Sequence, residues 1–336
     1  MDASSPSQCP VCRSPRLETL HTFSAGQAAQ HFVLIEENPD RHRALAAHIE
    51  ALWGAGQCCV LQCKDCDFGF SDPFVAGDAA FYNLAYMRAS YPLERWEYTR
   101  TIAALTAEGF HANRVLEVGS GCGFFLDKLA GSFVPAQGIT ALEFNDNAIG
   151  KLRAKGYAAI QSDVREANLE PGFDAVFMFQ VLEHIDQIHE LFARLHGLVR
   201  EGGLVFLSVP NQESITFNER NGSLFDMPPN HIGRYSQRAL KAIGDQHGLT
   251  LERVEVESFN FKSYMLRDIS YSYGRAAQQA GTLANWSRSL RSAPFGKLIG
   301  VATAAFLAPR RIFVWNRAAK AHLGGSFWAQ YRKTGS

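Results

Sequence analysis

The chain has 336 residues, a length that predicts about two domains, and its 46% hydrophobic and 20% charged residues are typical of a globular protein. Its 33 basic and 33 acidic side chains give a formal net charge of zero, which argues against nucleic acid as a partner. The first residues lack the apolar core of a signal peptide, and no apolar run reaches the roughly 20 residues of a membrane-spanning helix. We therefore expect a cytoplasmic protein, in which paired cysteines indicate a metal site.

Two C-x-x-C turns lie in residues 1–75, which we assign to a zinc-binding domain. Each turn can place two thiolates on one metal ion, so the two together supply a tetrahedral set of four ligands. Because four thiolates leave no position open for water or substrate, the predicted zinc ion is structural. The predicted ligands are Cys9, Cys12, Cys63 and Cys66. Cys58 and Cys59 are competing ligands, or else small buried residues on a strand over residues 58–62.

Residues 76–112 are rich in aromatic side chains and connect the zinc-binding region to the next domain. Before this region, between the two C-x-x-C turns, we expect an inserted helix over residues 40–53. A second predicted helix, over residues 93–108, ends the connecting region. The aromatic runs Phe81–Tyr86 and Tyr91–Trp96 either cover a ligand of the following domain or pack on its sheet. The sequence leaves both possibilities open, so we describe this region as an aromatic linker or lid.

A glycine-rich stretch organises the rest of the chain. Val115–Val118 predicts a buried strand, and from Phe124 onward apolar residues recur at helical spacing. Between them, Gly119, Gly121 and Gly123 predict a turn where a ligand can approach the backbone, beside N–H groups that favour an anionic group. A dinucleotide site would need its third glycine at position 124, which is Phe in this chain.

Glu117–Gly123, with the sequence EVGSGCG, resembles motif I of the class I S-adenosylmethionine-dependent methyltransferases. The resemblance implies an α/β fold with a Rossmann-like seven-stranded methyltransferase sheet, its core at residues 113–257, and S-adenosylmethionine as cofactor. The residues of motif I that it implies for cofactor binding are Glu117, Gly119, Ser120, Gly121 and Gly123.

The N-terminal region is similar to that of methyltransferases with a small zinc-ribbon-like domain, including the deoxysugar C-methyltransferases. In that group a glycine usually follows each C-x-x-C turn, whereas this chain has Arg13 and Asp67. The substitution argues against the usual zinc-knuckle geometry but leaves the set of four ligands unchanged.

The second and third predicted strands each end in an acidic residue. Glu143 ends residues 138–143, about 20 residues after the last glycine, where an acid typically accepts the ribose hydroxyls. Phe144 and Asn145 would flank the adenine, and a helix follows over residues 147–155. By resemblance, Asp163 accepts a hydrogen bond from the adenine amino group, and the backbone of Val164 contacts the ring.

The fourth predicted strand, residues 173–180, is apolar enough to be covered on both faces. It leads into the sequence QVLEHI, which is similar to the post-strand motif of small-molecule methyltransferases. Because ligands lie at the carboxyl ends of such strands, we expect Gln180, Glu183 and His184 near the transferable methyl group. His184 is either a catalytic base or a helix-start residue with a structural hydrogen bond.

Residues 226–236 carry a second candidate base. In the similar segment of the zinc-bearing C-methyltransferases a Glu-His pair acts as acid or base, and here His231 matches the histidine while Asn230 replaces the glutamate. A neutral amide cannot take a proton but can orient a substrate, which shifts the expected acceptor toward oxygen or nitrogen. His231 is otherwise a loop residue held by its own backbone. Ser236 is expected to cap a helix over residues 237–247, before a strand over residues 249–256.

Residues 258–322 predict a C-terminal helical insertion that precedes the final core strand and tail, residues 323–336. The apolar stretch Leu298–Ala308 and the arginines after it can form a substrate lid, a dimer face or an interfacial helix, and the thin basic face favours the first two. Weak contact with a membrane surface and the choice between monomer and homodimer stay open.

Together these patterns predict an enzyme that moves a methyl group from S-adenosylmethionine to an oxygen, nitrogen or carbon of a small molecule. A sugar, a nucleotide-sugar or a natural-product intermediate fits as the acceptor. The candidate catalytic residues are His231, His184, Glu183 and Asn230. One alternative is a nicotinamide-dependent oxidoreductase, against which Phe124 argues. The other is a non-catalytic zinc-containing scaffold, against which the intact series of Gly119, Glu143, Asp163 and His184 argues.

Overall fold

The computed structural model describes residues 8–86, 91–222, 226–278, 281–289 and 296–334, and the chain divides into two compact units. The first unit comprises Met1–Gln212, Asp226–Glu257 and Ser326–Ser336, and the second comprises Glu213–Phe225 and Ser258–Gly325. Residues 87–90 of the predicted aromatic linker lie outside the described residues. Within the described ranges, no helix combines the length and the apolar character that crossing a bilayer requires.

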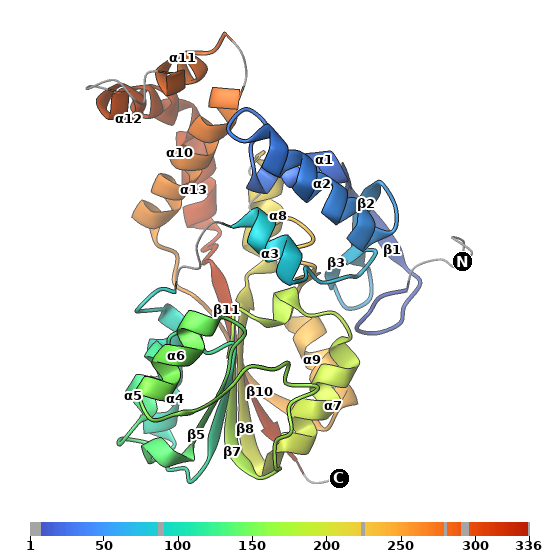
Figure 1. The fold of residues 1–336 in the computed structure, drawn as a ribbon, viewed down its shortest axis with the longest axis vertical. Coiled ribbons are helices and arrows are strands. Elements are labelled where there is room, and N and C mark those ends of the chain that lie inside the picture. The colour runs from blue at the N-terminus through green and yellow to red at the C-terminus, as the bar shows by residue number, and fades with distance from the viewer. Residues whose placement is uncertain (1–7, 87–90, 223–225, 279–280, 290–295, 335–336) are drawn as a thin grey trace. The chain divides into compact units, whose positions relative to one another are not determined.

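A seven-stranded sheet with the order β10-β11-β8-β7-β4-β5-β6 forms the centre of the first unit (Figure 1). Strands β4 to β8 run parallel to one another, whereas β11 runs antiparallel to both of its neighbours. The strands are β4 (Val115–Val118), β5 (Ile139–Leu142), β6 (Ala158–Ile160), β7 (Phe173–Phe179), β8 (Val199–Pro210), β10 (Leu249–Val256) and β11 (Ser326–Lys333). This sheet confirms the predicted α/β fold class, including the strand expected at the C-terminal end of the chain.

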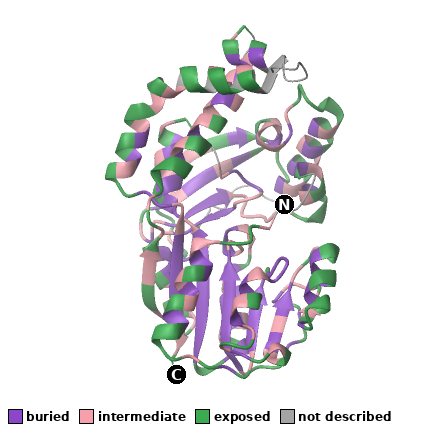
Figure 2. Ribbon diagram, turned by 90° about the vertical axis from the view of Figure 1, so that its left-hand side faces the viewer, coloured by how far each residue is buried: buried purple, intermediate pink, exposed green. Residues whose placement is uncertain are grey.

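Helices cover both faces of this sheet, which explains why β4 and β7 are buried along their whole length (Figure 2). Figure 1 shows α4, α5 and α6 on one face and α7 and α9 on the other. Phe125 and Leu152 pack in the core of the first face, and Phe192 and Leu240 pack in the core of the second. The helical segments are α4 (Trp96–Ala107), α5 (Phe124–Leu129), η1 (Ala136–Gly138), α6 (Asp146–Ala154), η2 (Leu182–His184), α7 (Ile188–Leu198) and α9 (Gln237–Gln246).

A second, smaller sheet of the first unit has the order β1-β2-β3-β9, with every pair antiparallel. Its strands are β1 (Leu17–Ser24), β2 (Gln57–Cys63), β3 (Gly69–Asp72) and β9 (Gly233–Arg234), accompanied by α1 (Ala25–Phe32), α2 (Pro39–Trp53) and α3 (Ala79–Ala85). The inserted helix predicted over residues 40–53 is α2, and its Leu45 and Ile49 are buried as the periodicity requires. Strand β9 has no counterpart in the sequence prediction, and it comes from the chain far beyond the other three strands.

The second unit is helical, as the predicted insertion before β11 requires. It contains α8 (Gln212–Arg220, whose first residue belongs to the first unit), α10 (Phe261–Gln278), α11 (Leu283–Ser289), α12 (Gly296–Leu307), η3 (Ala308–Arg311) and α13 (Ile312–Lys320). Its centre combines an ion pair between Arg311 and the buried Asp268 with a hydrogen bond from the Trp315 indole to the same carboxylate. Apolar side chains such as Val301 and Phe313 are exposed on it.

Candidate active site

The strand order reverses between β4 and β7, because the chain runs outward from β4 to β5 and β6 and then returns to β7 on the other side. Ligands of doubly wound sheets bind at such a reversal, at the carboxyl ends of the strands. Gly119 and Gly121 follow β4 there with φ angles of +72° and +52°, in the left-handed region. A Cβ atom at Gly119 would lie 2.5 Å from a methyl group of Val181, and one at Gly121 would lie 2.6 Å from the ring of Tyr91. At both positions a side chain would therefore be strained and would displace its neighbour.

Glu143, directly after β5, holds this glycine turn. Its Oε2 accepts a hydrogen bond from the Gly121 N–H at 2.7 Å, and its Oε1 accepts from the N–H groups of Phe144 and Asn145 at 2.9 and 3.0 Å. The carboxylate is thus fixed in place by three backbone N–H groups. Asn145 also caps α6 through its side-chain oxygen, and Phe144 is 66% exposed.

Tyr91, from the aromatic linker, lies against the same turn. Its ring is the group that a side chain at Gly121 would meet, and burial together with the neighbouring Glu143 raises the pKa of its hydroxyl. The Tyr91 ring thus lies against the glycine turn, and the covering of a ligand by the linker stays a prediction.

Glu117, the last acid before the glycines, is a buried carboxyl group with an unmet hydrogen-bonding requirement. The side chain is 2% exposed, and among the described residues its Oε2 has no hydrogen-bond partner. Burial and the nearby charge of Glu143 raise the pKa of Glu117 well above its ordinary value, and Arg95 partly opposes this. Leaving such an acceptor unsatisfied costs about 1–3 kcal/mol, so a cationic or N–H-bearing ligand would be favoured here.

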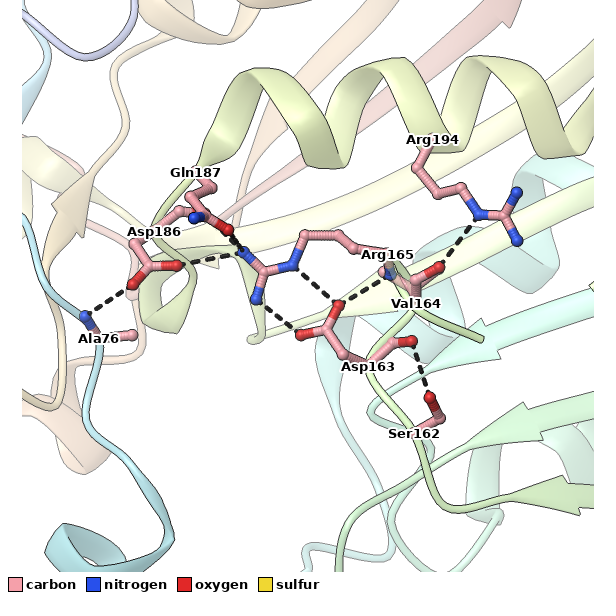
Figure 3. A network of polar contacts seen from close by, with 8 residues as sticks. All are labelled: Ala76, Ser162, Asp163, Val164, Arg165, Asp186, Gln187 and Arg194. Carbon is pink, nitrogen blue, oxygen red and sulfur yellow. Dashed lines mark hydrogen bonds and ion pairs between the residues drawn. The ribbon is translucent and has the colours of Figure 1, made fainter. Parts of the chain in front are cut away.

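Asp163 belongs to a polar network that the sequence did not predict (Figure 3). Arg165 donates to Oδ1 and Oδ2 of Asp163 at 2.9 and 2.7 Å, and it also reaches Asp186 and Gln187. Burial favours a higher pKa for Asp163, but the hydrogen bonds from Arg165 outweigh it and hold the pKa below its usual value. Asp186 in turn accepts from the backbone N–H of Ala76. The arginine two residues after the acid was the available signal.

The remaining predicted cofactor residues lie around the same strand ends. Ser120 is buried and donates through its hydroxyl to the Leu142 carbonyl. Val164 is buried, and its carbonyl accepts from Arg194. Gln180, at the end of β7 with a φ of 56°, donates to the hydroxyls of Ser208 and Ser326 at 3.3 and 3.4 Å. Its amide is therefore directed along β8 and β11 in this structure.

A second cluster, which we call the histidine cluster, consists of Glu183, His184 and His231. The imidazole centroids of His184 and His231 are 4.7 Å apart, and His184 Nε2 lies 3.8 Å from Glu183 Oε1. One ligand-type atom from each of the three residues lies within 4.8 Å of the others. The structure thus brings together three of the four predicted catalytic residues from two distant segments of the chain.

Each imidazole of the cluster is held through its Nδ1 atom. His231 Nδ1 lies 2.7 Å from the carboxylate of Asp226, and His184 Nδ1 lies 2.7 Å from the backbone carbonyl of Asn230. Because both partners are acceptors, both Nδ1 atoms donate a proton, and in the neutral form of each ring Nε2 keeps its lone pair. Asn230, predicted to act through its side chain, thus contributes a backbone oxygen to the cluster.

Tyr82 and Asp226 are members of this site that the sequence analysis did not name. The Tyr82 hydroxyl lies 3.1 Å from His184 Nδ1, and it comes from α3 of the N-terminal region. The aromatic run Phe81–Tyr86 was a signal for Tyr82, and Asp226 opens the segment that carries His231. Neither the aromatic run nor the segment that begins at Asp226 indicates which histidine its residue will contact.

Burial and neighbouring charges perturb the titration of the histidine cluster. Burial raises the pKa of Glu183 to about 7. Burial and the adjacent His231 lower the pKa of His184 to about 3. For His231, burial favours a lower pKa, but the hydrogen bond and charge of Asp226 outweigh it and raise the pKa above its ordinary value. Arg95 lowers the pKa of both Glu183 and Glu117, which places one cation near both the cluster and the glycine turn.

The four predicted zinc ligands also come together. The Sγ atoms of Cys9 and Cys66, and those of Cys12 and Cys63, are 3.5 Å apart, and all four lie within 4.8 Å of one another. A tetrahedral zinc site with bonds of about 2.3 Å places its sulfur atoms about 3.8 Å apart, so the donors fit zinc. The group of four forms without the other described cysteines, since Cys58 is buried on β2 and Cys59 faces β1 there.

The two turns have zinc-knuckle geometry, contrary to the expectation from their missing glycines. Arg13 and Asp67 adopt φ angles of 60° and 58°, the conformation that glycine would provide. Their N–H groups donate to the carbonyls of Cys9 and Cys63 at 2.8 and 3.0 Å. The same backbone hydrogen bond closes both turns, each with a left-handed residue that is not a glycine.

The segment that carries His231 is fixed between the two sheets of the first unit. The N–H of Ile232 donates to the Glu183 carbonyl, and its carbonyl accepts from the N–H of Ser71, both at 2.9 Å. Directly after it, β9 pairs with β3, and the Ser236 hydroxyl donates to the Cys66 carbonyl at 2.8 Å. The histidine cluster is therefore supported from one side by η2 and from the other by the cysteine-bearing sheet.

The glycine turn follows β4, the carboxylate of Glu143 follows β5, and the histidine cluster begins after β7. These features lie at the carboxyl ends of three adjacent strands of the seven-stranded sheet. Residues 92–254 match a family model described as a methyltransferase domain. The matched range contains all the predicted cofactor residues and the whole histidine cluster, but neither C-x-x-C turn. No curated protein matches the chain.

Among solved structures, the chain is similar to magnesium protoporphyrin IX methyltransferase from Synechocystis PCC 6803 with bound SAH, at 13% identity over 70% of this chain and 82% of that chain, with a TM-score of 0.44. It is also similar to phosphoethanolamine N-methyltransferase 2 from Haemonchus contortus in complex with S-adenosyl-L-methionine, at 16% identity over 70% of this chain and 53% of that chain, with a TM-score of 0.42. A third similar structure is the (4+2)-cyclase SpnF, at 16% identity over 70% and 81% of the two chains, with a TM-score of 0.43.

Proposed function

We propose that the protein is an S-adenosylmethionine-dependent methyltransferase that acts on a small molecule and carries a structural zinc ion. The observation that carries the proposal is the glycine turn after β4, where the Glu143 carboxylate binds the Gly121 N–H and the matched methyltransferase domain provides the surrounding sheet. The turn is unsuited to binding a pyrophosphate, because the Glu143 carboxylate lies against the turn and Phe124 occupies the position of the third glycine.

The residues at the turn fit a positively charged nucleoside better than a dinucleotide. Glu143 would accept from the ribose, since three N–H groups already hold its carboxylate beside the glycine turn. Glu117 would bind the ammonium group of the methionyl part, which satisfies its buried Oε2. Asp163 would share its carboxylate between Arg165 and the adenine amino group. Ser120, Phe144, Asn145, Val164 and Gln180 complete the proposed cofactor residues.

The cofactor supplies a methyl group activated on a sulfonium, so the protein has mainly to align the acceptor with that methyl and to exclude water. Tyr91 covers the glycine turn and Tyr82 covers the histidine cluster, and both come from the segment before the matched core. His231 is the proposed base, with His184 as its neighbour: its Nδ1–H is held by Asp226, which leaves Nε2 to accept a proton and stabilises the resulting imidazolium.

The acceptor is proposed to be a small molecule with an oxygen or nitrogen nucleophile. The side chain at position 230 is a neutral amide, and its backbone carbonyl is used to hold His184. Position 230 thus supplies no carboxylate to act beside the two imidazoles. Such a site suits removal of a proton from a hydroxyl or ammonium group more than removal of a proton from carbon. A sugar or nucleotide-sugar is suggested by the similarity of the cysteine-bearing region to that of deoxysugar methyltransferases.

Calorimetry with three ligands tests the proposal on the full chain. We expect S-adenosylmethionine and S-adenosylhomocysteine to bind with micromolar affinity and NADH to show no heat of binding. Binding of NADH in preference to the other two would instead favour an oxidoreductase. A screen with radiolabelled methyl donor against sugars, nucleotide-sugars and phenols then identifies the acceptor, and absence of transfer to every class with intact cofactor binding would favour a non-catalytic role.

A further inference from the structure

The histidine cluster has the composition and arrangement of a metal site. Two imidazoles and one carboxylate converge from η2 and from the segment before β9, with their nearest ligand-type atoms within 4.8 Å. In tetrahedral zinc sites bonds of about 2.0–2.1 Å place such atoms about 3.3 Å apart, so the atoms must approach one another by at most about 1.5 Å to close the set.

The hydrogen bonds around the cluster orient it for a cation. Metal-binding histidines usually donate their other ring N–H to a carboxylate or a backbone carbonyl, which fixes the ring and makes the free nitrogen a better ligand. His231 donates to the Asp226 carboxylate and His184 donates to the Asn230 carbonyl, each at 2.7 Å. Both Nε2 atoms are thereby left as ligands, and both rings are held by partners outside the cluster.

Glu183 provides an independent observation. Its side chain is 1% exposed, and among the described residues its Oε2 has no hydrogen-bond partner, although its backbone carbonyl accepts from the N–H of Ile232. When both imidazoles are neutral, the ionised carboxylate and the two Nε2 atoms are all acceptors. A divalent cation placed among the three atoms would convert this unfavourable grouping into a coordinated one.

We propose that Glu183, His184 and His231 bind one divalent transition-metal cation, with Zn²⁺ as the best fit, at a site separate from the four cysteines. Two histidines and a glutamate are a ligand set of catalytic zinc sites, in which the fourth position stays open. The cysteine site has four protein ligands and no open position, so the two sites would hold zinc for different purposes.

The binding of the cation does not depend on the proposed function, but the role of the cation in catalysis rests on it. An acceptor hydroxyl at the open position would lose its proton to water more easily, because the cation stabilises the alkoxide. The oxygen would then form a bond to the methyl carbon while the carbon–sulfur bond breaks and its electron pair stays on sulfur. The two imidazoles would then act as ligands, and this role would replace the role of base proposed for His231. The substrate class narrows to molecules with a hydroxyl or enol group.

Zinc content measured on the full chain tests the site without reference to activity. After loading with Zn²⁺ and dialysis, we expect about two zinc ions per wild-type chain and about one in the Glu183→Gln and His231→Gln variants. His111→Ala removes an exposed histidine outside the cluster and should keep both ions. One ion per wild-type chain, or two in both cluster variants, would overturn the proposal.

Cobalt spectroscopy gives a second answer that needs no variant. Co²⁺ added to protein whose cysteine site is already filled with zinc should produce visible d–d bands without thiolate-to-cobalt charge transfer. Absence of new bands would contradict a nitrogen and oxygen site. The affinity for S-adenosylmethionine is measured on the same samples. Cofactor binding with one zinc ion per chain would contradict only the proposed metal site. Two zinc ions per chain without cofactor binding would contradict only the proposed methyl transfer.

Discussion

The glycine turn and the histidine cluster lie in the same unit but are built in opposite ways. The turn is local: β4, the glycines and α5 follow one another in the chain, and Glu143 arrives one strand later. The histidine cluster is assembled from η2, from the segment before β9 and from Tyr82 of α3. A site made of neighbours in sequence can be recognised from a short motif, whereas a site made of distant segments depends on every contact that holds those segments.

The two regions also differ in how they depend on the cysteine-bearing sheet. Residues 92–254 contain the whole turn, but the His231 segment is held by β3 and by the carbonyl of Cys66, which lie outside that range. We therefore expect changes in the turn to affect cofactor affinity and changes in the N-terminal region to affect turnover. The following predictions test this separation.

Replacing Gly121 with valine should have the largest effect. The residue has a φ of +52°, and a side chain would meet the Tyr91 ring at 2.6 Å, so the turn must rearrange. We expect affinity for S-adenosylmethionine to fall about 1000-fold, equivalent to about 4 kcal/mol, by calorimetry. Gly150→Ala in α6 is the control, because an added Cβ there meets nothing within 4 Å, and its affinity should equal that of wild type. Unchanged binding by Gly121→Val would remove the turn from the cofactor site.

Replacing Cys63 with serine should separate the two regions most clearly. Loss of the proposed structural zinc is expected to destabilise the cysteine-bearing sheet by about 4 kcal/mol. Because β9 pairs with β3 and Ser236 donates to the Cys66 carbonyl, the His231 segment depends on that sheet. Turnover should therefore be lost while calorimetry at low temperature still detects cofactor binding. Equal loss of binding and turnover would show that the separation does not exist.

His231→Ala is expected to slow turnover about 100-fold, whether the imidazole acts as a base or as a ligand. Its partner Asp226 holds the ring from the same segment, whereas the glycine turn is held by Glu143. Cofactor affinity should therefore change less than about threefold. Wild-type turnover in this variant would make His231 a structural residue of the loop.

Glu143→Gln should weaken cofactor binding about tenfold. A glutamine can keep one acceptor oxygen, but its NH₂ group must then face an N–H donor of the turn or of Phe144, in place of the charge-assisted hydrogen bonds. Turnover at saturating cofactor should stay within about threefold of wild type. A fall in turnover without any change in affinity would contradict the assignment to the ribose.

Tyr82→Phe should give the smallest effect, about a threefold decrease in turnover. The change removes only the hydroxyl at 3.1 Å from His184 Nδ1, and that nitrogen keeps its hydrogen bond to the Asn230 carbonyl. Steady-state rates at saturating cofactor provide the measurement. A loss as large as that of His231→Ala would show that Tyr82 itself touches the reacting atoms.

The sequence predicted the glycine turn well because each of its determinants is local. The strand, the three glycines and Glu143 could be placed by periodicity and spacing, and the seven-stranded sheet was implied by the resemblance of motif I. Arg165 escaped prediction because an arginine near a strand end has many partners available to it. Its actual partners depend on how the loops after β6 and before α7 approach each other.

The histidine cluster could be predicted only as separate candidates. QVLEHI and the His231 segment were identified, but nothing in either pattern places Tyr82 against His184, or the Asn230 backbone in the role expected of its side chain. The knuckle turns show the reverse error: Arg13 and Asp67 break the expected glycine pattern yet reach the same backbone conformation. A left-handed residue costs about 1–2 kcal/mol, which hydrogen bonds and metal binding can offset.

The pairing of β3 with β9 also sets a constraint on how the molecule is made. The cysteine turns leave the ribosome early, but the strand that completes their sheet is synthesised only after the parallel core. Such a long-range pairing forms late in folding. During synthesis the nascent chain thus contains the glycine turn, Glu183 and His184 before His231 and β9 have been made, so the histidine cluster cannot form before the chain has passed residue 234.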